Sequence, residues 1–242
     1  MNKICRVTFL YAVTLGASQL TPTFASALDA ETQSRWPVYV SLFGGGSDLT
    51  GNVHTTHAYF MPDEVEHSLA TGRGYLLGGT IGVNASEDIR IEIEISHAEW
   101  DAKSYVFGGG AFQLADLAEG SVNMTYMLAN AWADWNNTSA FTPYIGGGVG
   151  LGWAIGTNVE YVPIGPFEKY SGDGAIGFAF QLGAGMKFDM TEHASIDLGY
   201  RFKGVSNIDF KSHSGFGPPH TEPYKGADLY SHNVQLGLTW QF

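Results

Sequence analysis

Cysteine is almost absent from this sequence: its 242 residues include one, Cys5. Cys5 lies within the first 27 residues, which have the composition of an export signal. The features of that signal are two cations, an apolar stretch and a small-x-small cleavage site: Lys3 and Arg6, Val7 to Leu20, and Ala25-Ser26-Ala27. We therefore predict that residues 1–27 form a cleaved signal peptide and that the mature domain, residues 28–242, contains no disulfide bond.

Positive charge is also scarce. The chain has 12 lysine and arginine residues against 24 aspartate and glutamate residues, a net charge of −12. Cleavage of the signal would remove Lys3 and Arg6 and no acidic residue, which changes the net charge from −12 to −14. An acidic chain repels phosphate backbones, so we expect no nucleic acid among its partners.

Long apolar runs are missing after the signal, so the mature domain has no candidate transmembrane helix. A secreted chain without disulfides needs either a large core or a sheet that closes on itself in lipid. Glycine is abundant, with 32 residues in 242, close to twice the usual ~7%. Aromatic residues reach 14%. Together, these two features favour strands in tight curvature.

Alternation with period two runs through the mature domain and indicates β-strands. Between Ile89 and Ser96, isoleucines occupy one face and mainly charged residues the other. Residues 174–188 and Tyr230 to Phe242 show the same division into an apolar face and a small or polar face. A strand with two such different faces requires two different environments.

The alternation predicts eight strands, and the connections between them alternate in length. The strands lie near residues 36–46, 74–85, 88–99, 121–135, 142–155, 174–188, 194–204 and 229–242. The connections 86–87, 136–141 and 189–193 are short, whereas 47–73, 100–120, 156–173 and 205–228 are long. Long strands, an even strand count and sorted connections are typical of an outer-membrane barrel. The predicted fold class is therefore all-β: an eight-stranded antiparallel up-and-down transmembrane β-barrel.

The tryptophans fall near predicted strand ends, where an amphipathic ring can lie at the lipid headgroups. They are Trp36, Trp100, Trp132, Trp135, Trp153 and Trp240. The alternative is that these rings form the core of a soluble sheet.

Four segments resemble the small eight-stranded outer-membrane barrels of the OmpA-like or opacity-protein (porin-family) type. They are residues 39–46 (YVSLFGGG), 143–152 (PYIGGGVGLG), 198–202 (LGYRF) and 234–242 (VQLGLTWQF). The resemblance implies a Gram-negative outer-membrane location. It also implies that the last segment is the signal read by the barrel-assembly machinery, through Val234, Leu236, Leu238, Trp240 and Phe242. Unlike two-domain members, this chain is expected to have no peptidoglycan-binding domain after Phe242.

An eight-stranded barrel is just wide enough inside to be filled by side chains. The alternation directs four cations and three anions inward: Arg90, Lys187, Arg201 and Lys203, with Glu92, Glu94 and Asp197. Small inward residues would leave room for them to meet: Gly78, Gly82, Ala129, Ala131, Gly146 and Gly183. We interpret the seven charges as an internal salt-bridge plug, although a gated ion path is the alternative. Their pairing depends on the stagger of the strands, which the sequence leaves open.

Two further patterns could carry chemistry. Histidines 54, 57 and 67 share a predicted loop with acidic residues but have no recognised metal-ligand spacing, so we expect no metal or other cofactor. Residues 202–207 (FKGVSN) resemble an aromatic-x-His-x-Ser-Asn motif of a lipid A deacylase, but Gly204 replaces the histidine. Substitute bases for Ser206 would be His97 with Glu99, or His193 with Glu192. Because a serine without a positioned base is not an activated nucleophile, we predict that the protein is not an enzyme.

The leading hypothesis is a monomeric surface barrel whose long loops make external contacts, in the manner of an adhesin or antigen. Its expected partners are outer-membrane lipid and lipopolysaccharide, the assembly machinery, and a host or surface ligand at the loops. The alternatives are a porin for small solutes or ions and, less favoured, a lipid A-modifying enzyme. The fold by itself does not decide between them.

Overall fold

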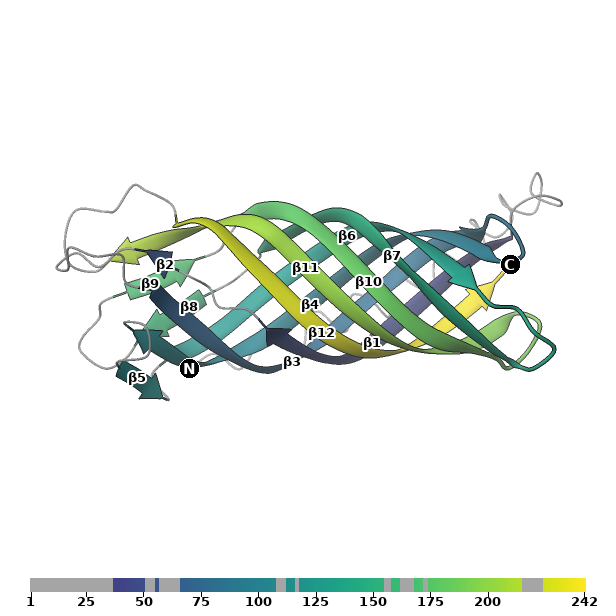
Figure 1. Ribbon diagram of the computed structural model, residues 1–242, viewed down its shortest axis with the longest axis horizontal. Coiled ribbons are helices and arrows are strands. Elements are labelled where there is room, and N and C mark those ends of the chain that lie inside the picture. The colour runs from purple at the N-terminus through teal and green to yellow at the C-terminus, as the bar shows by residue number, and fades with distance from the viewer. Residues whose placement is uncertain are drawn as a thin grey trace, which may run out of the picture. The chain divides into compact units, whose positions relative to one another are not determined.

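The computed structural model describes residues 37–50, 55–56, 66–107, 112–115, 118–154, 158–161, 168–171, 174–214 and 224–242. Their eight long strands form a closed antiparallel β-barrel, which confirms the predicted fold class (Figure 1). The strands are β1 (Val38–Thr50), β3 (Glu66–Asn84), β4 (Ile89–Phe107), β6 (Ala118–Asp134), β7 (Phe141–Ala154), β10 (Ile176–Asp189), β11 (Ala194–Ser214) and β12 (Tyr224–Gln241). The barrel closes where β12 pairs with β1 and Tyr39 lies opposite Gln241.

Several sequence predictions lie outside the described residues: the signal peptide, the start of the mature domain at Leu28, Trp36, and the loop residues His54 and His57. For His67, the structure describes the backbone in β3 but not the side chain. No helix in the described ranges is long and apolar enough to cross a membrane.

Strand pairing fixes the stagger that the sequence left open. Following paired residues once around the barrel from Phe188 leads back to the same strand at Phe178, ten residues away. The path runs through Phe188, Ile196, Leu238, Leu42, Gly79, Ile95, Met127, Leu151 and Phe178. Since stagger, tilt and diameter are linked, eight strands with this stagger are steeply tilted around a narrow interior.

The outer face of the barrel is apolar, as the alternation predicts. Ile89, Ile91, Ile93 and Ile95 are all exposed, whereas Glu92 and Glu94 between them are buried. β10 and β12 repeat the arrangement with exposed apolar residues: Ile176, Phe178, Leu182, Met186 and Phe188 on β10, and Val234, Leu236, Leu238 and Trp240 on β12, followed by the exposed Phe242 just after it. An exposed apolar band of this kind is what a lipid environment requires.

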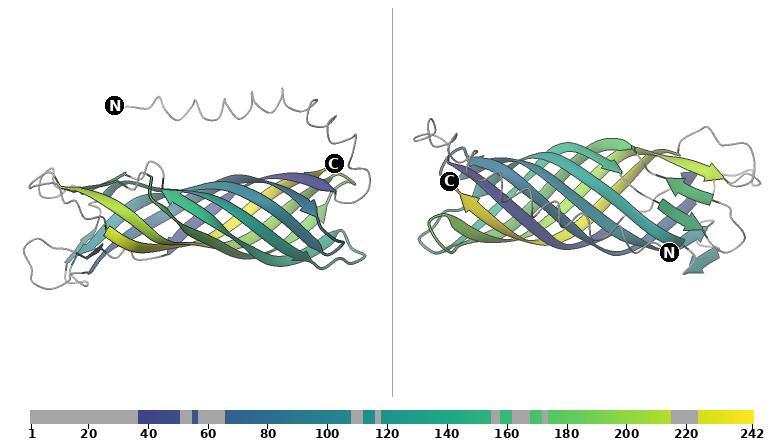
Figure 2. Two further views of the ribbon diagram at one scale, coloured as in Figure 1. Left: turned by 90° about the horizontal axis from the view of Figure 1, so that it is seen from above. Right: turned by 180° about the vertical axis from the view of Figure 1, so that it is seen from behind.

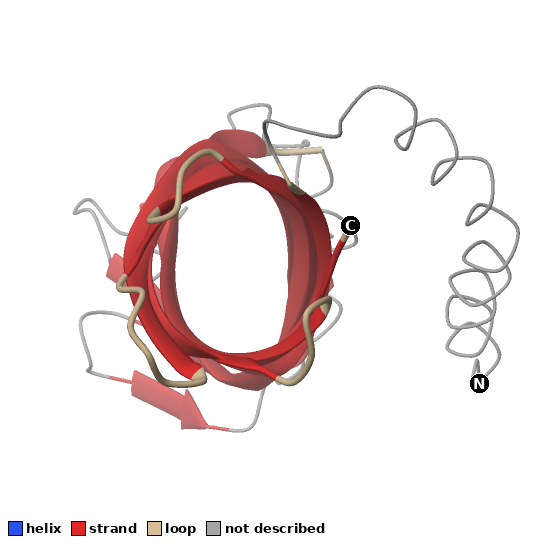
Figure 3. Cartoon of the chain, turned by 90° about the vertical axis from the view of Figure 1, so that its right-hand side faces the viewer, coloured by secondary structure: helices blue, strands red, loops and turns tan. Residues whose placement is uncertain are grey.

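The two ends of the barrel differ. Residues 85–88, 135–140 and 190–193 connect strands at one end, the short-turn end, which faces the viewer in Figure 3. At the opposite end, the loop end, strands continue into segments predicted as loops: β3 begins at Glu66, β4 reaches Phe107 and β11 reaches Ser214. The predicted strands ended too early there. Beyond the apolar band, backbone pairing continues, but the sequence no longer shows the alternation from which a strand is predicted.

Four short strands also lie at the loop end: β2 (Thr55–Thr56), β5 (Phe112–Ala115), β8 (Asn158–Tyr161) and β9 (Glu168–Ser171), which are labelled in Figure 1 and seen from two further sides in Figure 2. β8 pairs with β9, and this hairpin bridges two barrel strands, because β8 pairs with β6 and β9 pairs with β11. The sheet therefore extends beyond the ends of β7 and β10, which lie between β6 and β11 in the barrel.

The interpretation of the tryptophans was wrong for two of them. Trp135 and Trp240 are exposed on the outer face, but Trp100 and Trp132 point into the lumen and are 0% and 2% exposed. Their indole N–H groups find acceptors there, at Ser47 Oγ (2.8 Å) and Glu92 Oε1 (2.8 Å). A buried tryptophan is stable when its N–H is satisfied in this way.

Candidate functional site in the barrel lumen

The lumen is divided along its length into a polar and an apolar half. On β4, the inward residues Arg90, Glu92, Glu94 and Ser96 near the short-turn end are followed by Ala98 and Trp100 toward the loop end. On β11, Asp197, Arg201 and Lys203 are likewise followed by Val205 and Ile208. We call these halves the polar layer and the apolar plug. The alternation in the sequence predicted the charges of the polar layer but not the apolar plug.

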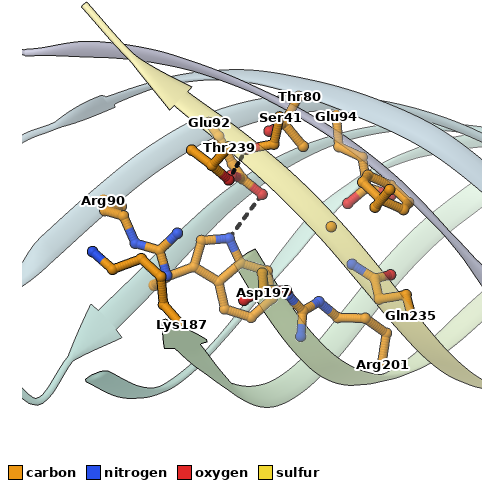
Figure 4. A pocket seen from close by; sticks show the side chains of 13 residues that line it. Ser41, Thr80, Arg90, Glu92, Glu94, Lys187, Asp197, Arg201, Gln235 and Thr239 are labelled. Atoms are coloured by element: carbon orange, nitrogen blue, oxygen red, sulfur yellow. Dashed lines mark hydrogen bonds between the residues drawn. The ribbon is translucent and has the colours of Figure 1, made fainter. Parts of the chain in front are cut away.

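The structure brings six of the seven predicted charges around one cavity in the polar layer (Figure 4). They are Arg90, Glu92, Glu94, Lys187, Asp197 and Arg201, and the seventh charge, Lys203, binds Glu94. The charges are supported by different means, and salt bridges account for only part of the arrangement.

Glu94 and Lys203 form the most enclosed ion pair, with 4% and 0% of their side chains exposed. The Lys203 ammonium also donates to Ser96 Oγ at 2.9 Å, and Ser96 in turn donates to Glu94 Oε1 at 2.7 Å. Gln181 Nε2 (2.7 Å) and Asn130 Nδ2 (3.0 Å) donate to Glu94 Oε2. Because these donors occupy both carboxylate oxygens, the buried charge is well compensated.

Glu92 is held by neutral donors. Its Oε2 accepts a hydrogen bond from the Tyr39 hydroxyl (2.9 Å), and its Oε1 accepts from Asn130 Nδ2 (3.0 Å) and Trp132 Nε1 (2.8 Å). Asn130 also donates to Glu94, so one amide links the two carboxylates of β4. Neither Asn130 nor Trp132 was among the predicted site residues, since neither carries a charge.

Arg90 makes a two-pronged ion pair with a residue that the sequence analysis missed. Arg90 Nε lies 2.7 Å from Asp134 Oδ2, and Arg90 Nη2 lies 2.8 Å from Asp134 Oδ1. Asp134 occupies the last inward position of β6, next to Arg90 on β4. The sequence feature that could have identified it is its inward place in the alternation at the end of that strand. Such a fork-on-carboxylate geometry is the strongest form of this ion pair.

Arg201 is held by aromatic rings. Its guanidinium carbon lies 4.2 Å from the centre of the Trp132 ring and 5.1 Å from that of Tyr144, and Arg201 Nη2 donates to the Tyr144 hydroxyl at 2.8 Å. Arg90 lies on the same Tyr144 ring (5.0 Å) and near Tyr39 (6.0 Å). Cations and rings thus alternate across the lumen in a stack that fills it with planar groups.

Lys187 and Asp197 lie close to the short-turn ends of β10 and β11. They are paired in register on β10 and β11, and both line the cavity. The Lys187 ammonium lies 3.7 Å from Asp189, at the end of β10. This part of the polar layer is more open to water than the Glu94–Lys203 pair.

The apolar plug closes the other half of the lumen. Its members are buried inward residues from all eight strands: Leu49, Leu76, Ala98, Trp100, Val122, Met124, Ala154, Ala179, Val205, Ile208 and Leu229. Close-packed apolar side chains leave no room for a hydrated ion.

Glycines on β7 make space for large side chains on β6. Gly146, Gly148, Gly150 and Gly152 occupy successive inward positions, and Trp132 and Asn130 lie opposite the first two in register. The prediction that Ala129 and Ala131 point inward was wrong, since both are exposed on the outer face. The physical reason is that a narrow lumen is filled by pairing large residues on one strand with glycines on the next.

The residues considered as catalytic bases have other partners. His97 Nδ1 lies 2.9 Å from Thr125 Oγ1, Glu99 accepts a hydrogen bond from Tyr75, and the His193 ring stacks on Trp240. No serine–base pair is therefore formed at Ser206 among the described residues. Nor do the described ranges contain a group of three His, Cys, Asp or Glu residues placed to hold a metal ion.

Comparison with known proteins agrees with this architecture. Residues 13–242 match the family model described as outer membrane protein beta-barrel domain. The chain is 27% identical over 231 residues to outer membrane protein PagN of Salmonella typhimurium, covering 89% of this chain and 94% of PagN.

Two solved structures share the fold. The outer membrane protein OprG from Pseudomonas aeruginosa superposes with a TM-score of 0.54 at 13% identity, covering 87% of this chain and 98% of OprG. The outer membrane protease OmpT from Escherichia coli gives a TM-score of 0.57 at 9% identity, covering 88% of this chain and 99% of OmpT. At these identities, the likeness concerns the fold alone. Together with the closed barrel and its apolar outer band, the family match shows that this chain belongs to the outer-membrane β-barrel family and resides in the Gram-negative outer membrane.

Proposed function

We propose that this protein is a non-enzymatic, non-conducting surface barrel that serves external contacts at its loop end, in the manner of an adhesin or antigen. The observation that carries the proposal is the filled lumen. The polar layer is tied together by the Glu94–Lys203 and Arg90–Asp134 pairs, and the apolar plug lies beyond it. A barrel that passes nothing must act through its surface.

The remaining space in the lumen supports this proposal over a porin. Two cavities are present in the polar layer, and each offers about 30 Å³ to water. A volume of this size holds about two water molecules. A porin requires a continuous aqueous path, and wide aqueous channels occur in barrels with more strands than eight.

The loop end supports the second half of the proposal. β4 and β11 continue there to Phe107 and Ser214, and the β8–β9 hairpin joins β6 to β11. This extended sheet supports the loops at this end, and binding residues are commonly found on loops carried by a regular scaffold.

The remaining partners are part of the same proposal. The apolar outer band contacts outer-membrane lipid and lipopolysaccharide, and the protein acts as a monomer without a cofactor. The assembly machinery reads the exposed apolar residues of β12 and the residue that follows it, which are Val234, Leu236, Leu238, Trp240 and Phe242. The external ligand is a molecule of a host cell or another surface.

The experiment removes the β8–β9 hairpin and keeps the barrel. Residues 156–172 are replaced by an Asn-Gly turn, which the geometry permits because Ala154 N already donates to Ala175 O at 2.9 Å. Bacteria carrying this variant should retain a folded barrel in the outer membrane but lose adherence to cultured host cells. A matched variant with an altered short turn, residues 190–193, should adhere like the wild type. The proposal is contradicted if bacteria with the wild-type protein, bacteria without the protein and bacteria with the trimmed variant all adhere equally.

A further inference from the structure

We propose that the polar layer is a blind, hydrated vestibule: water enters it from the periplasm, binds at Thr80 and Gln235, and stops at the apolar plug. This inference rests on the proposed function, in which the lumen is sealed, and assigns the seal to the apolar plug. It adds a water-binding site and a direction from which water enters. The salt-bridge plug predicted from the sequence includes neither.

The two cavities lie next to one another and together reach inward from the short-turn end. The outer cavity is lined by Thr191, Glu192 and His193 of the turn between β10 and β11. Both cavities share Arg90, Lys187 and Thr239 in their lining, so they adjoin one another. The inner cavity continues from these residues to Glu92, Glu94 and Arg201 (Figure 4). Because short turns of outer-membrane barrels face the periplasm, this route opens to that side.

Two buried oxygens line the inner cavity and lack partners among the described residues. They are Thr80 Oγ1 and Gln235 Oε1, in residues that are 8% and 6% exposed. Buried polar atoms are nearly always hydrogen-bonded, to protein or to ordered water. Since the cavity is polar and large enough for about two water molecules, water is the donor that fits both atoms.

The route stops where the inward residues become apolar. Beyond the cavity, β4 presents Ala98 and Trp100, β12 presents Leu229, and β3 presents Leu76, all buried. Ser47, the polar group on β1 at this depth, is already engaged: its hydroxyl accepts from Trp100 Nε1 (2.8 Å) and donates to Asn233 Oδ1 (2.6 Å). Water that reaches the plug therefore finds few polar partners among the described side chains.

The proposal is tested by thiol labelling at two serines of one strand face. Ser41 lines the inner cavity, whereas Ser47 is buried against Trp100, and both point inward from β1. Single variants Ser41→Cys and Ser47→Cys are made in a Cys5→Ser background, which removes the natural cysteine. Each is refolded into lipid vesicles, the orientation of the inserted barrel is determined with an epitope in the turn 135–140, and a small charged methanethiosulfonate is added to one side.

Ser41→Cys should react at least about tenfold faster than Ser47→Cys, and only with reagent on the short-turn side, since a thiol in the plug reacts only through opening. Ala98→Cys replaces Ser47→Cys as the plug variant if the latter does not fold. Equal rates for vestibule and plug, or protection of Ser41→Cys from both sides, would overturn the vestibule. Labelling of Ser41→Cys from the loop side would instead overturn the sealed lumen of the proposed function. A high-resolution crystal structure provides the second measurement and should show water within hydrogen-bond distance of Thr80 Oγ1 and Gln235 Oε1.

Discussion

Single charges in the lumen are compensated by particular neighbours, and Glu94 with Lys203 is the clearest case. Removing one partner leaves the other charge buried without its counterion, which costs about 3–5 kcal/mol in enclosed sites. We predict losses of that order in the free energy of unfolding for Glu94→Gln and for Lys203→Met, measured with urea in lipid vesicles. The double variant should lose at least about 2 kcal/mol less than the sum, since it leaves no isolated charge.

A matched control for the Glu94 and Lys203 variants is Lys187→Gln. Lys187 is part of the same layer, but its side chain is 23% exposed and its ammonium lies 3.7 Å from Asp189. A partly hydrated pair at that distance contributes at most about 1 kcal/mol. Additive losses for the Glu94 and Lys203 variants would show that water, and not the partner, compensates these charges.

Arg201 provides a second test of how a single charge in the lumen is held. Its guanidinium plane lies on Trp132 and Tyr144, and it donates to the Tyr144 hydroxyl. Lysine keeps the charge but not the planar fork, so Arg201→Lys should lower the free energy of unfolding by about 1–2 kcal/mol. The exposed Arg73 is the control, and Arg73→Lys should leave stability unchanged within about 0.5 kcal/mol. An Arg201→Lys barrel as stable as the wild type would show that charge alone holds this site.

The sequence predicted which charged residues point inward, but it could not predict their partners. Alternation alone assigns Glu94 and Lys203 to the lumen, whereas their meeting depends on the ten-residue stagger, which arises from pairing around the whole barrel. Asp134 was missed although it follows the alternation of β6, because its importance comes from lying beside Arg90. Trp100 and Trp132 were misplaced because an aromatic residue near a strand end fits the membrane interface and a narrow lumen equally well.

Among the strands, β7 depends on its glycines for a reason that can be tested. A Cβ added at Gly148 would collide with Asn130 and with the backbone oxygen of Ala129, whereas one added at Gly46 meets nothing within 4 Å. Gly148→Ala should therefore destabilise the refolded barrel by about 1–3 kcal/mol, because overpacking forces neighbours to shift. Gly46→Ala should be neutral or slightly stabilising. Equal effects in urea unfolding would mean that glycine matters here only for chain flexibility.

Strand number and direction were predictable because membrane strands need an apolar face of sufficient length, as β4 shows with Ile89 to Ile95. Strand ends at the loop end were not predictable, since β11 runs on to Ser214 through a stretch of sequence without sustained alternation of apolar and polar residues. The β8–β9 hairpin is held by backbone pairing with β6 and β11 and carries no side-chain signature in the sequence.

At the scale of the whole molecule, the lumen combines two different seals. The polar layer is held by ion pairs and stacked rings, and the apolar plug is held by close packing. Water can take the place of a partner in an ion pair, whereas a packed apolar layer must lose side chains or open before ions can pass. The barrel should therefore remain closed even when a single charge of the polar layer is neutralised.

The most direct test of this account is single-channel conductance in planar lipid bilayers. Wild-type protein should insert without a steady open current, and so should Glu94→Gln. The double variant Trp100→Ala with Met124→Ala, which removes two large side chains of the plug, should conduct and thereby show that insertion is detected. A steady current through the wild type, equal to that of the plug variant, would contradict the account and establish an aqueous pore in place of the sealed barrel.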